Sequence, residues 1–165
     1  MRVLIVEADG GSRGNPGVAG YGALVQDAAT GVVVAERAGY LGIATNNVAE
    51  YRGLIAGLRA ARAIDPAARL DVRLDSQLLV RQMKGEWKVK HPDMKVLWAQ
   101  AQASIRGASV TFTWAPRAQN SRADALANEA MDTRIESIRR GQFADDPAAE
   151  GPPLGDGTGG ARGLF

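Results

Sequence analysis

A chain of 165 residues with 45% hydrophobic and 23% charged residues has the size and composition of one soluble globular domain with its own core. It contains no cysteine, which excludes disulfides, zinc–thiolate centres and cysteine nucleophiles. No apolar run approaches the roughly 20 residues of a membrane span, and the apolar start is too short for a signal peptide, so we predict a cytoplasmic protein with no membrane partner.

The formal net charge of +2 is unevenly distributed along the chain, with +5 on residues 1–140 and −3 on residues 141–165. A mildly basic body suits a polyanionic partner, although charge alone is equally typical of a generic basic domain. The last 25 residues include seven Gly and three Pro, a composition that buries too little apolar surface to fold alone. We therefore predict a domain at residues 1–140 and a flexible tail or linker at residues 141–165.

The N-terminal part of the chain predicts three strands and a long helix. Segments rich in Val, Leu and Ile, separated by turn residues, predict strands at Arg2–Ala8, Ala19–Gln26 and Val32–Tyr40. Their short connections favour an antiparallel meander. Thr45 is a typical helix N-cap, and the Ala-, Leu- and Arg-rich sequence after it predicts a helix to Ala63 that Asp65-Pro66 ends. The residues on the core face of this helix are Leu54, Ile55, Leu58 and Ala61.

The C-terminal part alternates between strands and helices. The predicted elements are a strand at Leu70–Leu74, a helix from Ser76 to about Lys84, a helix from Pro92 to about Ile105, a strand at Ser109–Trp114 and a helix that starts at Asn120 or Ser121. Strands that are separated by helices should be parallel to the first strand. The order βββαβααβα predicts an α/β fold with a five-stranded mixed sheet, three antiparallel strands and then two parallel ones, flanked by helices.

Four acidic residues lie in polar or glycine-marked segments far apart in the sequence: Asp9, Glu50, Asp75 and Asp124. Asp9 is predicted to end the first strand, before glycines that let the backbone turn and approach a ligand. Asp75 follows a central strand, where open α/β sheets bind ligands. Carboxylates that converge from distant segments repel one another unless cations hold them. The pattern therefore predicts a Mg²⁺ site with phosphodiester chemistry.

Each of the four acids also has a structural interpretation. Asp9 is typical of a glycine-rich turn, and Asp75 can cap the helix that follows it. Glu50 and Asp124 lie near predicted helix N-termini, where the helix dipole favours a carboxylate. The two asparagines before Glu50 are poor helix formers, which indicates hydrogen bonding to a ligand. No single acid decides between the functional and the structural interpretation. All four are predicted to lie at one edge of one sheet, and this shared position is the stronger evidence for a common site.

A basic segment between the two middle helices contains Trp87 among Lys84, Lys88, Lys90 and Lys95. An aromatic residue among cations is typical of a nucleic-acid contact, and the alternative is a solvated loop whose Trp is anchored in the core. The single histidine, His91, is more typical of a structural or solvent-facing residue than of a catalytic one. One His and no Cys argue against a zinc site or a Ser-His-Asp triad.

The four acidic segments resemble the linked motifs of type 1 ribonuclease H: Asp-Gly-(x)4-Asn-Pro-Gly, Thr-Asn-Asn-x-x-Glu, Asp-Ser-Gln and Asn-x-x-x-Asp. They occur in the family's order and spacing over about residues 1–132. The resemblance implies a ribonuclease H-like fold and endonucleolytic cleavage of the RNA strand of RNA–DNA hybrids, with 5′-phosphate and 3′-hydroxyl products. Similar actinobacterial proteins carry a C-terminal phosphatase-like domain, which implies that the tail can lead to a fused domain.

The resemblance also implies roles for individual residues. It assigns catalysis and the binding of two Mg²⁺ ions, or Mn²⁺ in their place, to Asp9, Glu50, Asp75 and Asp124. It implies that backbone and side-chain groups of seven residues contact the hybrid: Gly11, Arg13, Asn15, Thr45, Asn46, Asn47 and Gln77. Among these groups, amides read RNA 2′-hydroxyls and a hydroxyl contacts a phosphate of the DNA strand. The predicted substrate surface is completed by Trp87, Lys88, Lys90 and Arg117.

Two departures from the family pattern bear on mechanism and affinity. The loop at residues 114–120 lacks the histidine of many members, and Arg117 can contact phosphate but stays protonated and cannot be a general base. The Lys-rich helix and loop of some members are also missing, and only Lys84–Lys95 stands in their place. We therefore expect weaker and more salt-sensitive hybrid binding, with discrimination relaxed toward duplex RNA.

Two other functions stay open at this point. One is a non-catalytic module that binds hybrid or duplex RNA on the same fold, which four clustered acids facing phosphates argue against. The other is a DNA-strand transferase of the same superfold, which would need a different acidic pattern and would lack the Asn-Asn and Gly-Asn-Pro-Gly elements. We expect the protein to be a monomer.

Overall fold

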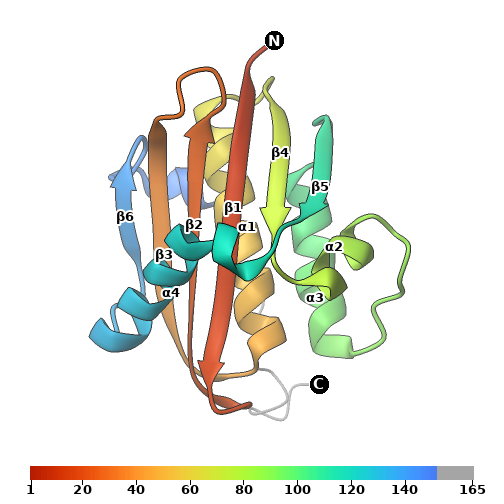
Figure 1. Ribbon diagram of the computed structural model, residues 1–165, viewed down its shortest axis with the longest axis vertical. Helices are drawn as coiled ribbons and strands as arrows, with labels where there is room; N and C mark the ends of the chain where they lie inside the picture. The colour runs from red at the N-terminus through yellow and green to blue at the C-terminus, as the bar shows by residue number, and fades with distance from the viewer. Residues whose placement is uncertain (152–165) are drawn as a thin grey trace.

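Six strands form one mixed sheet in the computed structural model, which describes residues 1–151. They are β1 (Val3–Arg13), β2 (Gly17–Asp27), β3 (Val33–Ala44), β4 (Arg69–Leu74), β5 (Val110–Trp114) and β6 (Ile138–Gly141). Their order in the sheet is β5-β4-β1-β2-β3-β6 (Figure 1). The antiparallel meander of β1, β2 and β3 is confirmed, as is the parallel pairing of β4 with β1 and of β5 with β4.

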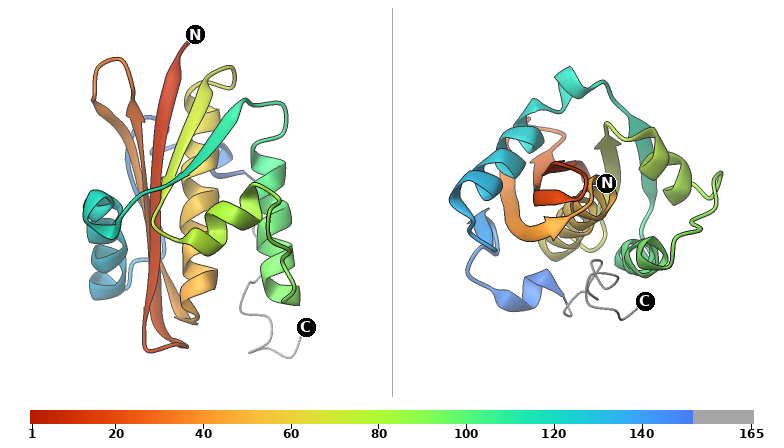
Figure 2. Two further views of the ribbon diagram at one scale, coloured as in Figure 1. Left: turned by 45° about the vertical axis from the view of Figure 1, so that its right-hand side comes forward. Right: turned by 90° about the horizontal axis from the view of Figure 1, so that it is seen from below.

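Four α-helices and two 3₁₀ turns connect or follow the strands within the described residues. They are α1 (Asn46–Ile64), α2 (Gln77–Met83), α3 (Pro92–Ser104), η1 (Arg117–Gln119), α4 (Ser121–Thr133) and η2 (Pro147–Glu150). α1 and α3 cover one face of the sheet, and α4 covers the other (Figure 2). None of the helices in this part of the chain has the length and hydropathy to cross a membrane. The predicted α/β class with helices on a mixed sheet is confirmed.

The predicted helix starts are confirmed by the caps. The Thr45 hydroxyl accepts a hydrogen bond from the Val48 N–H at 3.3 Å, and the Ser76 hydroxyl accepts one from the Leu79 N–H at 3.2 Å. Each bond satisfies an N–H that has no partner within its helix. α1 ends where predicted, at Asp65. These caps matter for function because they set where Glu50 and Asp75 stand.

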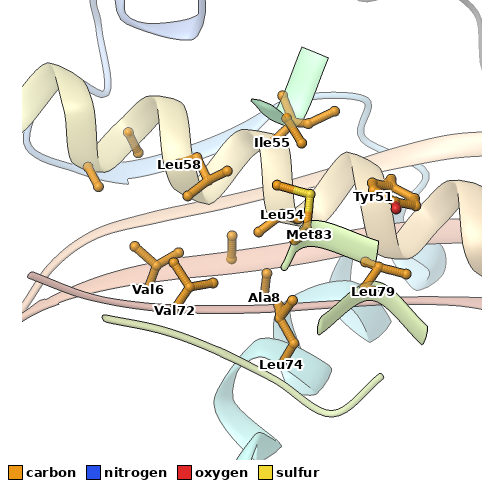
Figure 3. Close-up of a cluster of buried hydrophobic side chains, with 14 of the residues drawn as sticks. Val6, Ala8, Tyr51, Leu54, Ile55, Leu58, Val72, Leu74, Leu79 and Met83 are labelled. Carbon is orange, nitrogen blue, oxygen red and sulfur yellow. The ribbon is translucent and has the colours of Figure 1, made fainter. Parts of the chain in front are cut away.

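The core lies between α1 and the central strands. All four residues predicted for the core face of α1 have no exposed surface: Leu54, Ile55, Leu58 and Ala61. Leu54 and Leu58 face Val6 of β1 and Val72 of β4 (Figure 3). Burying one such side chain stabilises a fold by about 1.5–3 kcal/mol. The apolar spacing in α1 therefore holds the helix, and with it Glu50, against the central strands.

The first strand is longer than predicted. β1 continues through Asp9 and the glycines to Arg13, so the prediction that Asp9 ends the strand is wrong. Gly10 and Gly11 pair with Tyr21 and Gly20 of β2, and the turn itself lies at residues 14–16. Gly10, which is typical of a turn, here lies within the strand, where α1 passes too close for a side chain.

The sheet also has a sixth strand where five were predicted. β6 pairs antiparallel with β3, and the buried Arg37 of β3 donates hydrogen bonds to the carbonyls of Glu36, Arg140 and Gln142 at 2.8, 3.1 and 2.9 Å. Only Ile138 of β6 is buried and apolar, so the strand leaves almost no alternating pattern in the sequence. The boundary predicted at residue 140 falls inside β6. Residues 152–165 of the predicted tail lie outside the described residues.

Glycines let two helices approach the sheet closely. A Cβ on Gly10 would lie 2.1 Å from the carbonyl carbon of Ala49 in α1, and one on Gly53 would lie 2.6 Å from the carbonyl oxygen of Asp9. On the other face, a Cβ on Gly22 would lie 2.5 Å from the carbonyl oxygen of Ala123 in α4. These contacts bring Glu50 on α1 and Asp124 on α4 to β1.

We predict that Gly10→Ala lowers the free energy of unfolding by about 3 kcal/mol, because the added methyl overlaps the α1 backbone and forces the helix away from β1. Urea unfolding followed by circular dichroism measures this change. Gly11→Ala is the matched control, because its Cβ would meet nothing closer than Met131 at 4.0 Å. Equal stability of the two variants would contradict the close-approach explanation.

Candidate active site

Four separate elements bring the predicted acids to one cavity. Asp9 lies within β1, Glu50 on α1, Asp75 directly after β4 and Asp124 in the first turn of α4. All four line a cavity of about 530 Å³. Glu50 lies beyond the first turn of α1, so the helix dipole does not explain it. The shared cavity favours a common role for the acids over four separate structural ones.

The carboxylates are buried close enough together to oppose one another's ionisation. Asp9 is only 5% exposed, and its burial, together with the negative charge of Asp75, raises the pKa of Asp9 to about 8. Asp124 adds to the rise through a hydrogen bond and its own charge. Burial also raises the pKa of Glu50 to about 7, although a hydrogen bond from Ser76 and the positive charge of Arg117 oppose the rise.

Two carboxylate oxygens of the cluster have no protein partner. Glu50 Oε2 and Asp75 Oδ2 are buried and accept no hydrogen bond within residues 1–151. A buried carboxylate oxygen without a donor is costly, and a cation would relieve that cost. The hard oxygen donors of these residues fit Mg²⁺ or Mn²⁺. Within residues 1–151, no group of three or more acidic or histidine side chains is arranged to hold a metal ion by itself, so water and substrate oxygens would have to complete the coordination.

Three polar residues that were not predicted as site residues support the carboxylate cluster. Asn128 donates through Nδ2 to Asp124 Oδ2 at 3.3 Å, and Asn120 donates through Nδ2 to the Ala8 carbonyl at 2.9 Å. Asn120 is only 1% exposed, and this bond ties the start of α4 to β1 beside Asp9. Ser76 is the third. Asn128 could have been found from the sequence, because it follows Asp124 by four residues on the same predicted helix and so lies beside it.

Four of the residues predicted to contact substrate line the same cavity as the acids: Gly11, Arg13, Asn46 and Arg117. Asn46 Oδ1 accepts from the Ser12 N–H at 2.8 Å, which joins the start of α1 to β1. The Arg13 guanidinium forms an ion pair with Asp132 at 2.7 Å and donates to Asn128 Oδ1 at 3.2 Å. The cavity therefore has amide and cationic groups around its acidic floor.

Three further predicted residues lie together in a neighbouring cavity of about 430 Å³: Asn15, Thr45 and Asn47. Asn15 Oδ1 accepts from the Asn46 N–H at 3.1 Å, so the two cavities share a hydrogen-bonded border. His91 also lines this second cavity, and its Nδ1 accepts from the Asp93 N–H at 3.2 Å as the N-cap of α3. The structural interpretation of His91 is confirmed.

Comparisons with known proteins identify the family of the chain. A family profile described as reverse transcriptase-like matches residues 7–130. The chain is 33% identical to the ribonuclease H of Hydrogenovibrio crunogenus over 147 residues, which cover 80% of this chain and 97% of that protein. The chain belongs to the type 1 ribonuclease H family. It is also 50% identical to a bifunctional protein of Mycobacterium tuberculosis over 161 residues, which cover 97% of this chain and 44% of that protein.

Solved ribonuclease H structures share the fold. The N-terminal RNase H domain of the mycobacterial protein superposes with a TM-score of 0.77 and 54% identity, over 81% of this chain and 96% of that one. LC11-RNase H1, solved in complex with an RNA/DNA hybrid, superposes with a TM-score of 0.74 and 39% identity, over 79% of this chain and 98% of that one. The chain spans less than half the length of the mycobacterial relative.

The remaining predicted contacts of the ribonuclease H surface lie outside these two cavities. Gln77, Lys88 and Lys90 are exposed, and Trp87 is 48% exposed. Trp87 lies under the guanidinium of Arg81 at 5.2 Å from the ring centroid, so it is not anchored in the core. These side chains form a basic surface beside α2, and its contact with nucleic acid stays a prediction.

The raised carboxyl pKa values predict that the metal-free protein loses stability as pH rises from about 4 to about 8. Because the folded state holds the Asp9 proton up to about pH 8 and the unfolded chain releases it near 3.8, the unfolding free energy falls as pH rises between these values. Glu50 contributes in the same direction up to about pH 7. Asp9→Asn removes the larger part of this loss, so its stability relative to wild type should increase from pH 5 to pH 8.

Urea unfolding in EDTA at the two pH values measures this difference. The contrasting variant is Asp27→Asn, because a hydrogen bond from the Ala29 N–H lowers the pKa of the partly exposed Asp27. That carboxylate stabilises the fold above its unfolded pKa and loses the effect as pH falls, so this variant should not gain on wild type at pH 8. Parallel pH profiles for wild type and Asp9→Asn would contradict the burial of a protonated carboxyl.

Proposed function

We propose that this chain is a divalent-metal-dependent ribonuclease H that hydrolyses the RNA strand of RNA–DNA hybrids. The observation that carries the proposal is the convergence of four carboxylates on one cavity, with two of their oxygens buried and unpartnered. Ribonuclease H relatives and a neighbour solved with an RNA/DNA hybrid support the substrate class. We expect 5′-phosphate and 3′-hydroxyl products, action as a monomer in the cytoplasm, and some cleavage of duplex RNA.

The metal ions would be held by Asp9, Glu50, Asp75 and Asp124, with two Mg²⁺ ions or Mn²⁺ in their place. When bound, such ions supply an activated water and stabilise charge on the leaving oxygen. The protein contributes a rigid frame for these ligands, since each lies on or beside a different strand or helix of the packed fold. The raised pKa of Asp9 also means that a cation must displace a proton there near neutral pH.

Substrate positioning falls to the groups around the acids. Arg117 lies on η1 at the rim of the cavity and acts on Glu50 through its positive charge. Since a guanidinium stays protonated, its role is to bind a phosphate and not to accept a proton. The amides of Asn15 and Asn46, joined through the Asn46 N–H, present a prearranged polar border that suits RNA 2′-hydroxyls.

A non-catalytic binding module is the second candidate, and the site argues against it. A module that only binds phosphates gains nothing from four acids in its cavity, because they repel the ligand. The burial of Asp9 and Glu50 also costs stability that binding alone would not require. Family membership favours ribonuclease H over the DNA-strand transferase alternative.

A C-terminal fused domain stays a prediction.

We predict that Asp75→Asn abolishes cleavage of an RNA–DNA hybrid in Mg²⁺ and leaves the circular dichroism spectrum unchanged. Loss of one carboxylate ligand removes several kcal/mol of transition-state stabilisation, which corresponds to a decrease in rate of about a thousandfold or more. EDTA should abolish wild-type activity equally. Asp71→Asn is the control, because Asp71 lies on the same strand β4 but pairs with Arg73 at 3.1 Å. A fully active Asp75→Asn protein would refute the assignment.

The exposed lysines give a prediction about salt. Replacing Lys88 and Lys90 together by Ala should reduce the slope of the logarithm of hybrid affinity against the logarithm of salt concentration by about two, because each lysine releases counterions from one phosphate. Fluorescence anisotropy in Ca²⁺, to avoid turnover, measures the slope. Arg106→Ala tests the loss of a single positive charge away from the interface and should leave the slope unchanged, since this exposed residue precedes β5, at the far end of the parallel strands from Asp75. An unchanged slope would remove the lysines from the interface.

A further inference from the structure

A third cavity lies on the α1 face of the sheet, near the edge formed by β3 and β6. Its volume is about 330 Å³, and α1, β2, β3, β6 and η2 all contribute to its lining. Its polar lining residues include Tyr21, Arg37, Arg52, Arg59, Ser137 and Glu150. No lining residue is shared with the carboxylate cavity, whose floor faces α4. The proposed nuclease function therefore leaves this cavity unexplained.

Arginine is concentrated around this cavity. Arg37, Arg52 and Arg59 line it, and Arg139 of β6 reaches Glu150 in its wall. The acidic lining residues are Glu136 and Glu150, so positive charge exceeds negative charge. Burial and the nearby Arg52 lower the pKa of Arg59, a direction expected where guanidinium groups crowd together.

Two of these guanidinium groups have unused donors. Arg52 Nε and Arg139 Nη1 are buried and have no hydrogen-bond acceptor among the residues that the structure describes. Arg37 differs, because its donors already bind three backbone carbonyls and hold β6 in place. A buried N–H of a cation without an acceptor is costly, so an acceptor that enters the cavity would be bound favourably.

The carboxylate of Glu150 shows which chemistry the cavity accepts. Its Oε1 lies 3.4 Å from Arg139 Nε and 3.4 Å from the Ser137 hydroxyl, while its backbone carbonyl accepts from Arg59 Nη1 at 2.8 Å. The side chain is 44% exposed, and both of its polar contacts are long. Glu150 therefore occupies the anion position loosely, without satisfying Arg52 Nε.

We propose that this cavity binds the phosphate group of a small molecule of mononucleotide size, in competition with the Glu150 side chain. A phosphate offers more acceptor oxygens and more charge than one carboxylate, which suits the forked donors of Arg52 and Arg139. The cavity has the volume of a small-molecule site. Ile55 and Ala60 of α1 provide an apolar wall for the rest of such a ligand.

Isothermal titration of the full chain in EDTA with inorganic phosphate and with adenosine monophosphate tests the proposal. Glu150→Gln should bind both probes about tenfold more tightly than wild type, because it removes the competing charge. Arg52→Gln should weaken binding by about tenfold or more, the size expected for one lost charge-assisted hydrogen bond. Arg106→Gln, an exposed arginine outside this cavity, is the matched control and should bind like wild type.

Arg139→Gln provides a second variant if Arg52→Gln fails to fold, since Arg139 has a buried, unpartnered Nη1 and its Nε lies 3.4 Å from Glu150 in the cavity wall. A single-stranded oligonucleotide without terminal phosphates distinguishes a nucleic-acid backbone from a small molecule. The proposal is overturned if Glu150→Gln binds neither probe, if the cavity and control variants weaken binding equally, or if only the oligonucleotide depends on Arg52. Hybrid cleavage should be unchanged in Glu150→Gln, so the outcome is independent of the nuclease assay.

Discussion

The active-site cluster depends on the contact between the backbones of β1 and α1 at Gly10. No side chain separates the strand from Ala49 there, so Glu50 is carried to the strand residue Asp9. Gly22, which pairs with Asp9, allows the same approach by α4 on the opposite face and brings Asp124. Both approaches depend on the absence of a Cβ, and the apolar face of α1 supplies the free energy that holds the helix in contact.

This close packing creates an electrostatic conflict that the fold does not resolve by itself. Four acids share one cavity, and burial favours the protonated forms of Asp9 and Glu50. Supporting amides such as Asn128 orient the cluster but do not neutralise it. Stored unfavourable energy of this kind is typical of sites whose ligand supplies the missing charge. The cations proposed above would supply the positive charge that the fold leaves out of the cluster.

Features with a local cause could be predicted from the sequence. Thr45 and Ser76 cap their helices through their own hydroxyls, and Asp75 follows an apolar strand, so both helix starts and this acid were placed correctly. Features with a distant cause could not. The strand through Gly10 depends on a helix 39 residues away, and β6 depends on Arg37 of β3 more than on its own side chains. The same limit hid the structural role of Asn120, whose partner is the carbonyl of Ala8.

The pairing of β6 with β3 has a consequence for the solution behaviour of the chain. An uncovered β3 would present a long row of free backbone groups, which is a template for pairing between molecules. β6 covers part of this edge, and the exposed Arg140 discourages a further strand from adding outside it. The short strand β6 therefore reduces the tendency of the sheet to pair edge to edge with another molecule. A chain cut at residue 140 would lose the Gln142 carbonyl that helps hold Arg37, and with it part of that protection.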